Sequence, residues 1–141
     1  MTVLPTPDLD TALILGMAST AIPFARSREA EAERWLRILR LYGEAGVALQ
    51  ALGVSEGPLE EPAGDQQEQP APDAPEEAVV ARVLDDAAAA AHRRGSAVVT
   101  SEDVLRAVMG FYGSAFDHVL RAHGTDRDEV LARLDLQTEA A

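Results

Sequence analysis

The sequence predicts an all-α fold, and three observations support this. Apolar residues recur at the three- and four-residue spacing of a helix face. No stretch alternates apolar and polar residues with the period of two that a half-buried strand requires. Hydrophobic residues make up 47% of the chain but aromatic residues only 4%, so the core must be built from Ala, Leu and Val, a composition that favours helices. A chain of 141 residues is expected to form a single domain, 1–141.

The first helix is expected to begin at Thr6-Pro7-Asp8. Threonine can cap a helix, proline suits the first helical position, and aspartate in the first turn favours the positive helix end. Apolar residues then follow at helical spacing until Pro23, which ends the helix.

Two further helices are expected in the first third of the chain. Ser27 is the expected cap of a helix over 29–42, and Gly43 is expected to close that helix. A short third helix over 47–52 follows.

Residues 55–77 differ in composition and are expected to form an acidic, Pro-rich linker. The segment holds five prolines, three glutamines and eight acidic residues, with no basic residue. Such a composition cannot bury enough apolar surface to offset the entropy lost on ordering. An acidic lure for a basic partner is the alternative interpretation.

Four helices are expected after the linker. The longest covers 76–94 and ends at Gly95, and the last covers about 126–136. The run 97–99 is too short to form a strand of its own. Ser or Thr precedes Asp at capping-box spacing before each of the three shorter helices. These pairs are Thr100 with Asp103, Ser114 with Asp117, and Thr125 with Asp128.

The chain is expected to contain two related halves. Residues 33–37 match 102–106, and the Tyr-Gly pair at 42–43 matches the pair at 112–113. The spacing of about 70 residues indicates a duplicated half-domain rather than a repeat array. The alternative is that any two short helices rich in Leu, Ala and Arg look alike. The two predicted repeats cover 7–54 and 78–136.

Three short runs in the second half mark helix boundaries: GSAVVTSEDVL at 95–105, Gly-Ser-Ala at 113–115 and VLRAHG at 119–124. They resemble the repeat of the Clp N-terminal (Clp R) domain family, here in a stand-alone form without the ATPase rings. The resemblance implies a bundle of about seven to eight helices in two pseudo-symmetric repeats. It also implies a module that sits at the front of a ring-shaped, ATP-driven unfoldase and binds adaptors, degradation tags or unfolded segments. The chain has no Lys and therefore no Walker loop.

The resemblance also suggests candidate ligand-binding residues. One branch of the family binds phosphorylated arginine through acidic residues at the helix entry of each repeat. On that pattern, Glu102 and its first-half counterpart Glu33 are candidates, together with Ser101. A carboxylate beside a groove can accept a guanidinium through two hydrogen bonds. The alternative for Glu102 is that it only complements the helix dipole.

Other polar and aromatic residues are expected to be structural. Trp35 is expected to pack in or beside the core, and the rings of Tyr42 and Tyr112 are expected to pack under helix turns with their hydroxyls at the surface. His118 and His123 are five residues apart, which does not place them on one helix face, so we expect no metal site. Asp103 is expected to act as a capping-box acid rather than a ligand contact.

Charge and composition narrow the function classes. A net charge of −12 disfavours binding to nucleic acid or to an anionic lipid surface. There is no Cys, no Gly-x-Ser-x-Gly elbow and no long apolar run. We therefore expect a cytoplasmic protein with no catalytic residues, cofactor or metal.

These observations lead to one leading hypothesis and two alternatives. The leading hypothesis is a non-catalytic adaptor or regulator of a Clp unfoldase or protease that binds a peptide, adaptor or phosphoarginine-type ligand between its two repeats. The alternatives are a decoy that sequesters a peptide antibiotic aimed at the unfoldase, and a helical dimerisation module. The sequence leaves the ligand and the oligomeric state open.

Overall fold

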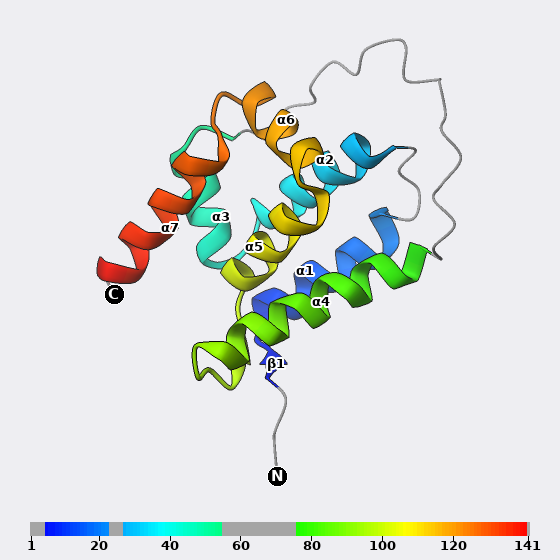
Figure 1. Cartoon of the computed structure of the whole chain (residues 1–141), viewed down its shortest axis with the longest axis vertical. Coiled ribbons are helices and arrows are strands. Elements are labelled where there is room, and N and C mark those ends of the chain that lie inside the picture. The colour runs from blue at the N-terminus through cyan, green and yellow to red at the C-terminus, as the bar shows by residue number, and fades with distance from the viewer. Residues whose placement is uncertain (1–4, 23–26, 55–75, 141) are drawn as a thin grey trace.

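The computed structural model describes residues 5–22, 27–54 and 76–140, and these form a helical bundle (Figure 1). The expectation of an all-α fold with about seven helices is confirmed over these residues. The first three helices are α1 (Leu9–Ala21), α2 (Arg28–Leu39) and α3 (Gly43–Ala51). The other four are α4 (Glu76–Arg93), α5 (Ser101–Tyr112), α6 (Ser114–Ala122) and α7 (Arg127–Ala140). No helix in the described part of the chain is long and apolar enough to cross a membrane.

A short parallel ladder joins the chain start to the loop before α5. Its strands are β1 (Thr6–Pro7) and β2 (Val98–Val99). The backbone N–H of Thr6 donates to the carbonyl of Ala97 at 3.1 Å. The prediction that Thr6 caps the first helix is therefore wrong. Asp8 is the cap, and its side chain accepts a hydrogen bond from the backbone N–H of Thr11 at 2.8 Å.

Helix α2 packs against α1, α3, α5 and α6. Ser27 caps it as expected, because the serine side chain accepts from the backbone N–H of Ala30 at 3.0 Å. Trp35 is fully buried in the core, which confirms its predicted packing role. The other largest fully buried side chains include Phe116, Ile14, Leu36, Leu39 and Leu49.

Gly43 begins a helix rather than ending one. Helix α2 already ends at Leu39, and Gly43 takes a left-handed conformation, with φ +69°, as the first residue of α3. A Cβ at this position would lie 2.9 Å from the Cβ of Ser101 and closer still to its hydroxyl. Glycine is therefore required both by backbone conformation and by the close approach of α5.

The three predicted capping boxes have different outcomes. The Thr100–Asp103 box forms, with the backbone N–H of Thr100 donating to Asp103 at 2.9 Å. No side chain caps α6, so the prediction for Ser114 is wrong. At α7, the backbone N–H of Glu129 donates to Asp126 at 2.9 Å, so Asp126 occupies the capping position predicted for Thr125.

The segments on either side of the predicted linker pack against each other. Helix α1 lies against α4, as Figure 1 shows, α2 contacts α5 and α6, and α3 contacts α5 and α7. The duplication of the two halves stays a prediction. The predicted linker, 55–77, lies outside the described residues except for the start of α4.

Candidate functional site

Glu33 lies in the middle of α2 rather than at a helix entry. Its side chain is 14% exposed and accepts a hydrogen bond from Nε of Arg37 at 2.7 Å. Both carboxylate oxygens also face Nε2 of His123, at 3.0 and 3.1 Å. His123 directly follows α6, and its side chain is only 2% exposed. Glu33 therefore links α2 to the end of α6.

Glu102 lies in the first turn of α5, as expected, and its side chain is 19% exposed. It accepts a hydrogen bond from Nε of Arg106 at 3.0 Å, which repeats the i,i+4 geometry of Glu33 and Arg37. A second nitrogen of Arg106 donates to Asp135 on α7 at 3.1 Å. Glu102 is thus part of an ion-pair network that extends to the last helix.

Ser101 is buried and serves another helix. Its hydroxyl oxygen accepts a hydrogen bond from the backbone N–H of Ala45 at 3.0 Å. That N–H lies in the first turn of α3, where helix geometry leaves backbone donors without a partner. The N-cap residue of α3 itself, Tyr42, makes no capping hydrogen bond with its side chain. Ser101 therefore caps α3 from the start of α5.

An ion pair beside Glu102 joins the end of α4 to the start of α5. Arg94 follows α4, and its guanidinium donates to the carboxylate of Asp103, whose side chain is 3% exposed. This hydrogen bond raises the pKa of Arg94, with smaller contributions from the charges of Asp103, Glu102 and Glu44. Asp103 consequently has two structural tasks, capping α5 and holding Arg94.

A buried hydrogen-bond chain crosses the bundle between α2 and α5. Nε1 of Trp35 donates to the hydroxyl of Tyr112 at 3.0 Å, and that hydroxyl donates to Glu31 at 2.8 Å. Burial, followed by the hydrogen bond to Glu31, raises the pKa of Tyr112. The expectation of a surface hydroxyl is therefore wrong for Tyr112. The guanidinium of Arg28 covers this end, with Cζ 5.2 Å from the centroid of the Tyr112 ring.

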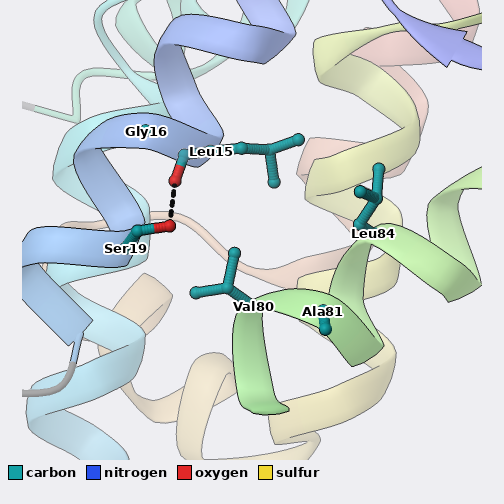
Figure 2. Close-up of a pocket in the computed structure, with 6 residues that line it drawn as sticks. All are labelled: Leu15, Gly16, Ser19, Val80, Ala81 and Leu84. Atoms are coloured by element: carbon teal, nitrogen blue, oxygen red, sulfur yellow. Dashed lines mark hydrogen bonds between the residues drawn. The ribbon is translucent and has the colours of Figure 1, made fainter. Parts of the chain in front are cut away.

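Glu33 and Glu102 have different tertiary partners, and their place beside a common groove stays a prediction. Glu33 contacts His123 after the end of α6, whereas Glu102 lies near Arg94 after α4 and is linked through Arg106 to Asp135 on α7. A pocket of about 350 Å³ lies elsewhere, between α1 and α4 (Figure 2). The residues that line this α1–α4 groove are Leu15, Gly16, Ser19, Val80, Ala81 and Leu84.

The α1–α4 groove is almost entirely apolar. Among the described residues that line it, Ser19 has the one polar side chain, and its hydroxyl already donates to the carbonyl of Leu15 at 2.9 Å (Figure 2). Apolar exposure continues along α1, because Leu9 and Leu13 are 76% and 43% exposed. The composition of α1 is a sequence signal for this surface. Helix α1 holds a single charged residue, Asp10, and a helix that is apolar on all sides is expected to be covered.

The arrangement offers binding surfaces and structural ion pairs. Over the described residues, no group of three or more His, Asp or Glu side chains could hold a metal ion. The chain was also compared with known proteins. No family model, curated protein or solved structure matches it.

Proposed function

We propose that this chain is a non-catalytic binding module that acts as an adaptor or regulator of a Clp unfoldase or protease. It takes a peptide, an adaptor or a phosphoarginine-type ligand between the two halves of its sequence. The proposal rests on the helix-boundary runs at 95–105, 113–115 and 119–124, which resemble those of the Clp N-terminal domain.

The observation that carries the proposal is the position of the α1–α4 groove. Helix α1 belongs to the first predicted repeat and α4 to the second, so the groove opens between the two segments that the sequence suggests are related. A concave, largely apolar surface with a preformed shape is the usual form of a binding site. Its lining residues carry no acid, base or nucleophile apart from the hydroxyl of Ser19, which favours binding over catalysis.

The two acidic candidates can bind a phosphoarginine-type ligand only if their present arginine partners are displaced. Glu33 and Glu102 each already hold an arginine four residues later, Arg37 and Arg106. A guanidinium ligand must displace these two arginine side chains, which are 37% and 36% exposed. Glu102 is the more accessible of the two, since its side chain is 19% exposed against 14% for Glu33.

The test uses the whole chain, immobilised, with a purified Clp unfoldase hexamer held assembled by a slowly hydrolysed ATP analogue. Specific retention of the unfoldase, or of a Clp substrate or adaptor presented in the same way, is expected. Failure to retain any of these three would contradict the proposal. Calorimetric titration with phosphoarginine then tests the acidic residues, with the double variant E33Q/E102Q expected to lose any heat that the wild type gives.

A further inference from the structure

We propose that the α1–α4 groove is the docking surface for a basic amphipathic helix of a partner protein. This inference rests on the proposed function and names the surface and the chemistry of the partner. The starting observation is that the groove and the neighbouring side chains Leu9 and Leu13 leave an apolar face of α1 exposed. Contiguous apolar surface of this kind marks an interaction site in a folded protein.

The dimensions favour side chains of a helix over a large ligand. Ligand pockets span roughly 300–1,000 Å³, and this groove of about 350 Å³ lies at the lower end of that range. Two helices, α1 and α4, form its walls. A third helix can lay apolar residues from successive turns into such a groove, which is a common mode of peptide recognition.

Charge decides which kind of helix fits. Helix α1 has no basic residue, and its one charged residue, Asp10, is exposed. Asp85, one turn after Ala81, is exposed. The basic residue of this part of α4, Arg82, has its guanidinium 5.7 Å from the ring centroid of Phe111 on α5. The described surroundings of the groove are therefore acidic and complement a cationic partner.

The same charges argue against a second copy as the occupant. Two copies that met through this face would each carry a net charge of −12. Like charges across an interface cost affinity and slow association. A basic helix reverses the sign of both effects.

The test exploits two exposed helical glycines. A Cβ at Gly16 or at Gly110 would meet nothing within 4 Å, so both positions accept a larger side chain. Gly16 lines the groove, whereas Gly110 lies on α5 and does not. Gly16→Leu therefore fills the groove, and Gly110→Leu is its matched control.

The probe is a fluorescent peptide of about 18 Leu and Lys residues with leucines at i, i+3, i+4 and i+7, long enough to form a helix on binding. Fluorescence anisotropy is expected to show binding to the wild type and to Gly110→Leu, and binding to Gly16→Leu weakened at least about tenfold. A scrambled peptide of the same composition and a Leu/Glu peptide of the same pattern are both expected to bind at least about tenfold more weakly. Equal binding by Gly16→Leu, by the scrambled peptide or by the Leu/Glu peptide would overturn the inference.

Two further outcomes separate this inference from its alternatives. Light scattering is expected to show a wild-type monomer, and a dimer that Gly16→Leu dissociates would overturn the inference in favour of a second copy. Retention of the Clp unfoldase should be reduced in Gly16→Leu and unchanged in Gly110→Leu. If both variants retained the unfoldase equally, the assignment of the α1–α4 groove as the docking surface would be contradicted, and the proposed function would stand. If the wild type bound the peptide but retained no Clp component, the docking surface would stand and the proposed function would be contradicted.

Discussion

Helices α2 and α5 carry the same Glu-x-x-x-Arg motif but use it differently. In both, the arginine Nε donates to the glutamate, at 2.7 Å for Arg37 with Glu33 and 3.0 Å for Arg106 with Glu102. In α2 the glutamate is further engaged by the buried His123, whereas in α5 it is the arginine that extends the network, to an exposed Asp135. The local ion pair follows from helical spacing. The tertiary partner depends on which helix end lies opposite.

The two helix starts differ as well. Helix α2 is capped by Ser27 on an exposed first turn. Helix α5 begins with a capping box, holds Arg94 through the buried Asp103, and provides Ser101 as the cap of α3. The start of α5 is therefore a junction of α3, α4 and α5. We expect it to be more sensitive to substitution than the start of α2.

The largest difference is expected between Asp103→Ala and Ser27→Ala. Loss of Asp103 removes a cap and leaves Arg94 without its carboxylate, which should lower the free energy of unfolding by about 2–3 kcal/mol. Loss of Ser27 removes only a cap and should cost about 1 kcal/mol. Urea unfolding monitored by circular dichroism measures both. Equal costs would contradict the view that the α5 start is a junction.

Glu33→Gln and Glu102→Gln sharpen the comparison of the two ion pairs. Glu33→Gln should cost about 1–2 kcal/mol, because it weakens contacts to both Arg37 and the buried His123. Glu102→Gln should cost no more than about 1 kcal/mol, because the Glu102 side chain is 19% exposed against 14% for Glu33. The same unfolding experiment applies, and a larger loss for Glu102→Gln would show that the contact to His123 adds nothing.

The two tyrosines, Tyr42 and Tyr112, provide a smaller, pH-dependent contrast. The pKa of Tyr112 is raised above the value of about 10 expected for the unfolded chain. Above about pH 10 the unfolded chain therefore loses a proton that the folded chain keeps, so stability falls as the pH rises further. Tyr112→Phe should cost about 1 kcal/mol at pH 7 and reduce this alkaline decline. Tyr42→Phe should lower the free energy of unfolding by less and leave the alkaline loss of stability in place. Thermal unfolding between pH 8 and 11 distinguishes the two variants.

Much of the fold was predictable because helix boundaries depend on local chemistry. The Ser27 cap and the Thr100–Asp103 box each satisfy backbone donors within one turn, and spacing in the sequence reveals them. Thr6 failed as a cap because β2, more than 90 residues away, pairs with this segment. The predicted role of Gly43 was wrong because its actual role depends on Ser101, which is more than 50 residues away in the sequence.

The candidate site was predictable only in part. Residue type identified Glu33 and Glu102 as charged and able to bind a guanidinium, but not that internal arginines and His123 already contact them. The α1–α4 groove depends on how two distant helices pack, and no motif encodes that. The composition of α1 did give a signal. A helix with so few charged residues is expected to be covered on more than one face.

The most direct test of the account is the rate at which a Clp unfoldase and its peptidase degrade a fluorescent tagged substrate in the presence of ATP. The account predicts that adding this chain changes the degradation rate at least about twofold, in a saturable manner. It also predicts that Gly110→Leu acts like the wild type and that Gly16→Leu has a weaker effect. A rate that stays constant at saturating concentrations of the folded wild-type chain would contradict the account.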